Sequence, residues 1–221
     1  MSFEQTEWLN NRLLLYRLLS TVYREGVSPK IVELFIDADF MATLAGEVDT
    51  SAWRDVCSKL QQEVGQHQED FKFYCKALQV EHMRLFVGPD HLEAPPWESV
   101  YLTREKLLCG EPTQQVKAFY HSFGMVCDTE EHELADHIGV ELSFMSELCA
   151  QAMGKIDQAL PTDDELLGQK KFLQEHLLMW AQHFLADVKA KTRMPFFAYF
   201  AALTLDWLQA DLQVLAKKTK E

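Results

Sequence analysis

Glycine, cysteine and long apolar runs are all scarce in this chain of 221 residues. Only 9 glycines are present, which disfavours an all-β fold because such folds need many tight turns. The 5 cysteines are odd in number and include no Cys-x-x-Cys pair, so neither a disulfide framework nor a zinc knuckle is expected. Reduced thiols in a cytosolic protein are expected instead.

No segment has the composition of a signal peptide or of a membrane span. Charged side chains interrupt the N-terminal apolar residues, and the longest apolar run, 196–205, is far too short to cross a bilayer. We therefore expect a cytoplasmic protein without stable membrane insertion.

Basic side chains are outnumbered. The 21 Lys and Arg residues stand against 34 Asp and Glu residues, which gives a net charge of −13. Nucleic-acid binding needs a basic surface and is therefore not expected. An acidic chain suits a basic partner, such as an arginine-bearing peptide, although solubility alone also accounts for the charge.

Catalytic and cofactor-binding motifs are absent as well. His132 and His137 are five residues apart, not the four that place two zinc ligands on one helical face. No histidine has a glutamate three positions before it, as a di-iron bundle requires. The sequence has no phosphate-binding loop and no Gly-x-Ser-x-Gly elbow. We expect neither an enzyme nor a bound metal or cofactor.

Apolar residues recur at three- and four-residue steps along nearly the whole chain, and no alternating strand pattern appears. The pattern predicts an all-α fold, a single compact helical domain of about eight or nine helices. Ser28 with Pro29, Thr103, and a capping box at 162–165 mark helix starts, and Gly110 marks an end. The expected helices span 5–25, 29–44, 52–65, 69–87, 103–110, 113–123, 133–153, 162–190 and 195–218.

The most informative stretch joins a helix end to a stiff aromatic loop. Residues 81–89 read EHMRLFVGP, and the Gly-Pro pair cannot continue the helix. Residues 95–101 read PPWESVY, in which two prolines hold the chain extended beside Trp97 and Tyr101. A stiff aromatic loop loses little entropy on binding, so this loop is a candidate binding surface, with core packing as the alternative.

A charged segment, DTEEHELADH at 128–137, precedes an apolar helical stripe. On a helix, Glu133 and His137 would share one face, whereas Asp136 and His137 would point about 100° apart. The residues alone favour a charged helix start, in which acids complement the positive end of the helix dipole. A binding role is the alternative.

Taken together, these segments resemble the TorD/DmsD/NarJ family, the cytoplasmic chaperones that mature molybdenum-cofactor oxidoreductases. The family pattern has Leu-Phe near Gly-Pro, then Pro-Pro-Trp-x-Ser, then Glu-x-x-Asp-His, and residues 85–89, 95–101 and 133–137 match it in order and spacing. Residues 195–200 match a further family segment before the last helix. The resemblance extends over most of the chain and leans to the DmsD-like branch.

The resemblance implies one TorD-like chaperone domain over 1–221, with 88–98 as a candidate hinge, in a monomer or a domain-swapped dimer. Such a protein would bind the twin-arginine leader or the apo form of a molybdoenzyme of the DMSO or TMAO reductase type. It would assist cofactor insertion, delay export and contact the Tat translocase. The implied leader-binding residues are Leu85, Phe86, Trp97, Ser99, Tyr101, Gly110, Glu133, Asp136 and His137.

Three residues depart from the family pattern. His82 and Asp90 make the expected site more polar, and Leu134 stands where the family often has proline. Two other functions stay open beside export chaperoning. One is a NarJ-type assembly chaperone for a client that is not exported, and the other is a weak guanine-nucleotide-binding protein, for which the sequence offers no phosphate cradle.

Overall fold

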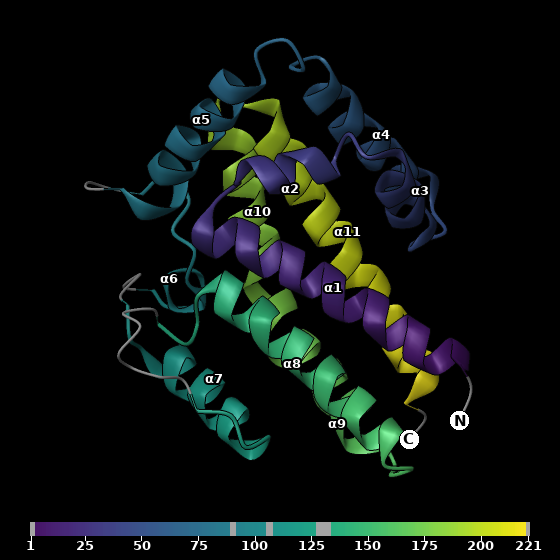
Figure 1. The fold of residues 1–221 in the computed structure, drawn as a ribbon. Helices are drawn as coiled ribbons and strands as arrows, with labels where there is room; N and C mark the ends of the chain where they lie inside the picture. Colours follow the sequence, from purple (N-terminus) through teal and green to yellow (C-terminus); the bar gives the residue numbers. More distant parts are fainter. Residues whose placement is uncertain (1–2, 89–91, 105–107, 127–133, 220–221) are drawn as a thin grey trace. The chain divides into compact units, whose positions relative to one another are not determined.

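The computed structural model describes residues 3–88, 92–104, 108–126 and 134–219, and within these ranges the chain is built from helices (Figure 1). No strand forms in the described ranges, where Trp97 and His137 make an isolated antiparallel bridge. The predicted all-α class is confirmed. None of the described helices is both long and apolar enough to cross a bilayer.

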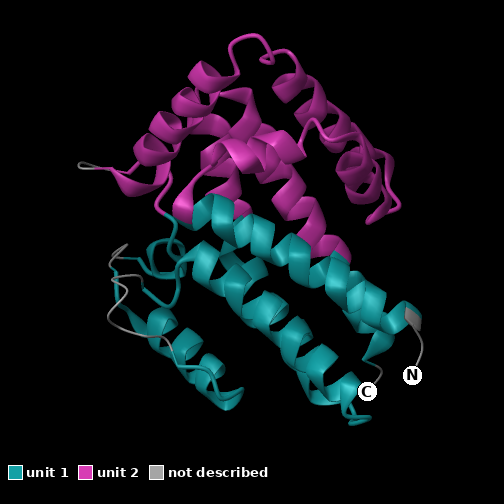
Figure 2. Cartoon of the chain, viewed as in Figure 1, with its two compact units in different colours: residues 1–24, 96–181, 211–221 teal, residues 25–95, 182–210 magenta. Residues whose placement is uncertain are grey.

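The chain divides into two compact units, coloured separately in Figure 2. Unit 1 consists of residues 1–24, 96–181 and 211–221, and unit 2 consists of residues 25–95 and 182–210. Neither unit is continuous in sequence. The single domain expected from the sequence and the hinge at 88–98 stay predictions.

Unit 1 contains the N-terminal helix, the middle of the chain and the C-terminal end. Three helices extend into unit 2: unit 1 contains all but the last residue of the first, the start of the second and the end of the third. Its elements are α1 (Phe3–Glu25), α6 (Glu98–Leu102), α7 (Glu111–Ser122), α8 (Ile138–Asp157), α9 (Asp163–Phe172), the π-helical turn η3 (Leu173–Leu177), the start of α10 (Leu178–Lys191) and the end of α11 (Pro195–Lys218).

A buried ion pair joins α1 to α11 inside unit 1. Arg12 donates to the two carboxylate oxygens of Asp211 from Nε and Nη2, each at 2.7 Å, and the Tyr16 hydroxyl donates to the same carboxylate at 2.6 Å. All three side chains are buried. Asp211 thus fixes the first helix of the chain to the last.

Unit 2 is held together by aromatic side chains. Phe35 packs edge-on against Phe196 and Phe200, at ring-centroid distances of 5.4 and 6.3 Å, and Trp53 lies 6.3 Å from Trp207. The unit contains α2 (Pro29–Leu34), α3 (Ala38–Gly46), α4 (Ser51–Gly65), α5 (Phe71–His82), the π-helical turn η1 (Met83–Val87), the end of α10 and most of α11.

Several helix limits follow the predicted signals, and one predicted helix is two. Ser28 accepts a hydrogen bond from the N–H of Ile31 at 3.4 Å, and Pro29 begins α2 as predicted. The continuous helix predicted over 29–44 is wrong, because Asp37 accepts from the N–H of Phe40 at 2.8 Å and starts α3. A capping residue in mid-segment therefore overrode the apolar periodicity.

Three further predicted limits are wrong. Thr103 ends α6 rather than starting a helix, and Gly110 precedes α7. The start predicted at 162 is correct, since Thr162 is the N-cap of α9, but its side chain makes no cap, and Glu165, its expected partner in the capping box, pairs with Lys155 at 2.6 Å instead. The helix expected from residue 133 begins at Ile138.

Candidate functional site

Two segments of unit 1 that are distant in sequence are joined by their backbones. The N–H of Glu98 donates to the carbonyl of Asp136 at 2.9 Å, and the isolated bridge pairs Trp97 with His137. The aromatic loop and the charged segment that the sequence singled out therefore meet at one place.

The Asp136 side chain caps α6. It is fully buried, and its Oδ2 accepts a hydrogen bond from the N–H of Ser99 at 3.0 Å. Ser99 lies in the first turn of α6, where backbone N–H groups have no partner within the helix. Oδ1 has no hydrogen-bond partner among the described residues, so the carboxylate retains an acceptor oxygen.

His137 caps the N-terminus of α8. Its Nδ1 accepts a hydrogen bond from the N–H of Gly139 at 3.0 Å, which requires Nδ1 to be unprotonated. The Trp97 ring lies edge-on to the imidazole, with centroids 5.8 Å apart. Because His137 precedes the helix, the prediction that it shares a helical face with Glu133 is wrong, and Glu133 itself lies outside the described residues.

Behind Asp136 lies a buried carboxyl pair that sequence reasoning missed. Glu98 and Glu141 are 1% and 0% exposed, and Glu98 is close enough to Glu141 to raise its pKa. His176 Nδ1 lies 3.3 Å from both Glu98 oxygens, and Trp180 Nε1 donates to Glu141 at 3.3 Å. The signal for Glu141 was present, since it is a charged residue beside the apolar stripe of α8.

Burial is the largest cause that raises the pKa of Glu141 well above its ordinary value, and its neighbours Glu98 and Asp136 raise it further. The Trp180 hydrogen bond favours the ionised form, but it is outweighed. The folded protein therefore favours the neutral form of Glu141, as is usual for a buried carboxyl group.

Tyr101 and Gly110 lie in the same unit as the capped segments. The Tyr101 ring stacks on Trp180, with centroids 5.6 Å apart and planes 29° apart, and so contacts the residue that donates to Glu141. Gly110 is the N-cap of α7 and is half-buried.

Leu85 and Phe86 belong to unit 2 and are core residues there. They are 0% and 3% exposed, and Phe86 packs against Phe184 and Phe197 at 5.8 and 6.0 Å. Both lie in the π-helical turn η1, a geometry that is rare and frequent at functional sites. The implied leader-binding residues thus fall in both units, and Trp97, Ser99, Asp136 and His137 are brought together in unit 1.

Comparison with known proteins supports the family resemblance. The family model described as nitrate reductase delta subunit matches residues 39–186, about two thirds of the chain. The chain belongs to the TorD/DmsD/NarJ family of molybdoenzyme-maturation chaperones.

Individual relatives of this TorD/DmsD/NarJ chaperone are themselves named as chaperones. The chain is 33% identical over 129 residues to a probable Tat proofreading chaperone DmsD of Haemophilus influenzae, an alignment that covers 58% of this chain and 57% of the relative. It is 28% identical to the chaperone protein TorD of Shewanella oneidensis over 92% of this chain and 90% of that one. It is 24% identical to the chaperone protein TorD of Aliivibrio salmonicida over 93% of this chain and 94% of that one.

Chaperone function, not catalysis, is what these relatives have in common. The chain is accordingly a chaperone and not an enzyme. Among the described residues, no group of three or more His, Cys, Asp and Glu side chains is placed to hold a metal ion. The part each predicted leader-binding residue plays stays a prediction.

The capping role of Asp136 makes two substitutions differ in this TorD/DmsD/NarJ chaperone. Asp136→Ala leaves the buried N–H of Ser99 without a partner and is expected to lower the free energy of unfolding by about 1–3 kcal/mol. Asp136→Asn retains an acceptor oxygen and is expected to cost less. Urea denaturation of both variants would measure the difference, and equal losses would contradict the capping role.

Proposed function

We propose that this chaperone binds the twin-arginine leader of a molybdenum-cofactor oxidoreductase in the cytoplasm, assists cofactor insertion and so delays export. The observation that carries the proposal is the buried Asp136 carboxylate, whose Oδ1 has no described partner, beside the Trp97–His137 pair. A guanidinium group is the natural donor for such an oxygen, because an arginine–carboxylate hydrogen bond is assisted by both charges.

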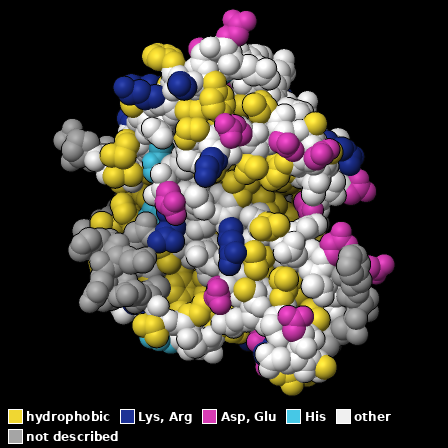
Figure 3. Space-filling model, in the orientation of Figure 1, with side chains coloured by type: hydrophobic (Ala, Val, Ile, Leu, Met, Phe, Trp, Pro, Cys, Tyr) yellow, Lys and Arg dark blue, Asp and Glu magenta, His cyan; other side chains and the backbone are white. Residues whose placement is uncertain are grey.

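Surface charge alone does not make such a site. On the face shown in Figure 3, Asp and Glu side chains are scattered among hydrophobic and basic ones and do not form one patch. The net charge of −13 therefore provides a general attraction for a basic leader. We assign the specific recognition of arginine to buried carboxylates, with Asp136 and His137 as the polar rim and Glu133 as a further member.

The apolar part of a leader needs a different surface. We assign it to Leu85, Phe86, Trp97 and Tyr101, with Gly110 as a point of close backbone approach. An amphipathic leader would bind by placing its apolar face in a hydrophobic groove. Because Leu85 and Phe86 are buried, this part of the proposal requires η1 to rearrange on binding.

A second candidate function is assembly of a client that is not exported, as NarJ-type chaperones perform. The family description, nitrate reductase delta subunit, favours it. The two functions differ in one chemical respect, since only an export chaperone needs the arginine pair of the leader.

Calorimetric titration with synthetic leader peptides from neighbouring molybdoenzyme genes separates the two functions. Each leader would be compared with a version whose arginine pair is replaced by alanine. We expect a Kd of about 1 μM or lower that weakens at least about tenfold without the arginines. Asp136→Asn, which retains the cap, is expected to weaken only the arginine-containing leader, and the exposed Glu147→Gln serves as the control.

Equal binding of both peptide versions would contradict the export function and favour the NarJ-type one. Absence of binding by any leader would contradict both functions as peptide-based recognition.

A further inference from the structure

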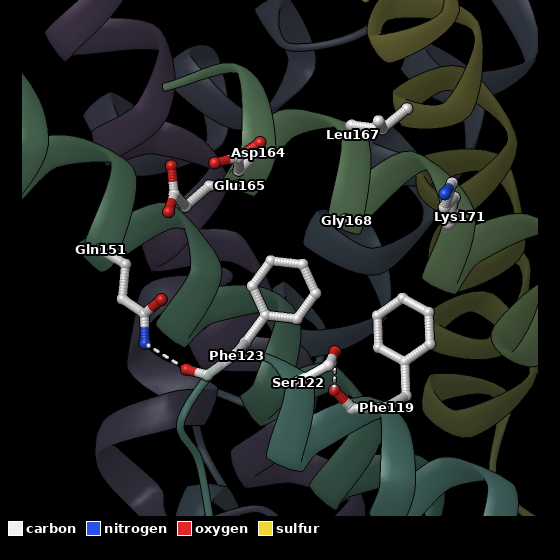
Figure 4. A pocket seen from close by; sticks show the side chains of 9 residues that line it. All are labelled: Phe119, Ser122, Phe123, Gln151, Asp164, Glu165, Leu167, Gly168 and Lys171. Carbon is white, nitrogen blue, oxygen red and sulfur yellow. Dashed lines mark hydrogen bonds between the residues drawn. The ribbon is translucent and has the colours of Figure 1, made fainter. Parts of the chain in front are cut away.

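A groove in unit 1 involves none of the residues assigned to leader binding. It has a volume of about 500 Å³ and is lined by side chains of α7, α8 and α9 (Figure 4). Pockets of this size accommodate several large side chains. All the residues that line the groove are described, and all belong to one unit.

Aromatic and aliphatic groups form the middle of the groove. Phe119 of α7 and Phe123, which follows the last residue of that helix, stack with their centroids 5.7 Å apart, and both residues are only half-buried. Gly168 lets the Phe123 ring pack on the backbone of α9, since a Cβ at this position would collide with the ring. Leu167 is 38% exposed on the same helix. The groove therefore offers apolar contact area that the fold does not cover.

One end of the groove is acidic. Glu165 is 4% exposed, and its Oε1 pairs with Lys155 Nζ at 2.6 Å. Its Oε2 is buried and has no hydrogen-bond partner among the described residues. The exposed Asp164 lies next to it (Figure 4). Two carboxylates against one lysine leave this end with an acceptor and a net negative charge.

The other end of the groove is basic. Lys171 follows Asp164 by seven residues, which is two helical turns or about 10.5 Å along α9. In Figure 4 the two acidic residues lie on the side of Phe123 and Lys171 lies on the side of Phe119. A helical ligand with opposite charges seven residues apart would match both ends at once.

We propose that this groove binds a helical peptide segment that carries an arginine or lysine and, two turns away, an acidic residue, with bulky apolar side chains between them. The basic group binds Glu165 Oε2 and Asp164, the apolar side chains contact Phe119 and Phe123, and the acidic group faces Lys171. That the segment belongs to the client rests on the proposed function, whereas the ligand chemistry does not.

Fluorescence anisotropy with labelled model helices tests the proposal on the full-length protein. One probe has arginine at position i, leucine at i+3 and i+4, and glutamate at i+7 in an alanine–glutamine background, and it lacks an arginine pair. A second probe has glutamate in place of arginine. We expect saturable binding of the first probe and at least about tenfold weaker binding of the second.

Substitutions on the exposed rim keep the test independent of folding. Leu167→Glu and Asp164→Lys are each expected to weaken the arginine probe by about tenfold. The matched controls, Leu160→Glu and Asp163→Lys, change exposed residues that do not line the groove and are expected to alter binding less than about twofold.

Two results would contradict the proposal that this groove binds a helical peptide. One is no saturable binding of the arginine probe up to about 1 mM, and the other is equal binding by groove variants and controls. Failure of the groove test would not bear on the leader titration, because that titration depends on Asp136 and on an arginine pair that the probes lack. Loss of leader binding with intact probe binding would contradict the proposed function alone.

Discussion

Replacing Glu141 by glutamine is expected to raise the free energy of unfolding at neutral pH by about 1–3 kcal/mol. Glutamine can accept the hydrogen bond from Trp180 as Glu141 does, and its amide group can donate to the neighbouring Glu98. It also removes the free-energy cost of keeping a buried carboxyl group protonated at neutral pH. Urea denaturation followed by tryptophan fluorescence would measure the gain.

The dependence of this gain on pH has a definite sign. The pKa of Glu141 is 4.5 in an ordinary environment and is raised in the folded protein. Above pH 4.5 the unfolded chain has released the proton that the native chain retains, so the native state loses stability as the pH rises to the folded pKa. The wild-type protein should lose stability over this window, and Glu141→Gln should lose less.

A matched control lies on the same helix. Glu147 is exposed on α8, and Glu147→Gln is expected to leave both the stability and its pH dependence unchanged. His176 and Asp136 are further ionisable groups beside the pair, so the slope of Glu141→Gln is compared with that of the wild-type protein and not with zero. The assignment would be contradicted if Glu141→Gln and wild type lost stability with the same slope above pH 4.5.

Removing the carboxylate of Asp211 is expected to produce the largest loss of stability of any single substitution considered. Asp211→Ala leaves the guanidinium of Arg12 buried without its partner, which costs about 3–5 kcal/mol in comparable buried pairs. Burial alone would lower the pKa of Arg12, but Asp211 outweighs it and the pKa is raised. Without Asp211 the guanidinium still keeps its proton, because arginine is too strong a base to be neutral at physiological pH, so the variant cannot avoid the cost by neutralising Arg12.

Two controls separate the buried charge from the loss of any ion pair. Arg12→Met combined with Asp211→Leu removes both charges and is expected to recover most of the stability that Asp211→Ala loses. Asp49→Ala breaks an exposed pair with Arg54, whose side chains are 98% and 54% exposed, and should have no measurable effect. Thermal unfolding of the variants would test all these expectations, and a double variant as unstable as Asp211→Ala would contradict the explanation.

Helix content was predictable because its signals are local. Pro195 begins α11, and the apolar period of the last segment runs to Lys218, where the helix ends. The break at Asp37 was equally local but was masked by apolar residues on both sides of it. The start of α9 after Thr162 was predicted correctly, although Glu165 pairs with Lys155 and does not complete the predicted capping box.

The site depended on long-range pairing, which a single sequence does not reveal. Asp136 and His137 were singled out, and the capping of α8 by His137 agrees with the helix start that the residues alone favoured, whereas Asp136 caps α6, a different helix. Glu98 was overlooked, because its partners lie 43 and 78 positions away, at Glu141 and His176. Buried polar pairs of this kind are recognised by the groups that surround them, and those groups come from separate helices.

The bond between Arg12 and Asp211 also has a consequence during synthesis. The first helix leaves the ribosome long before residue 211 is made, roughly 10–40 s earlier at ordinary rates of translation. During that interval the guanidinium of Arg12 lacks the carboxylate with which it is buried in the native state. The amphipathic N-terminal helix likewise lacks the last helix against which it packs. Unit 1 can reach its native state only after nearly the whole chain has emerged, so a nascent chain of this chaperone is itself exposed to aggregation and to other chaperones.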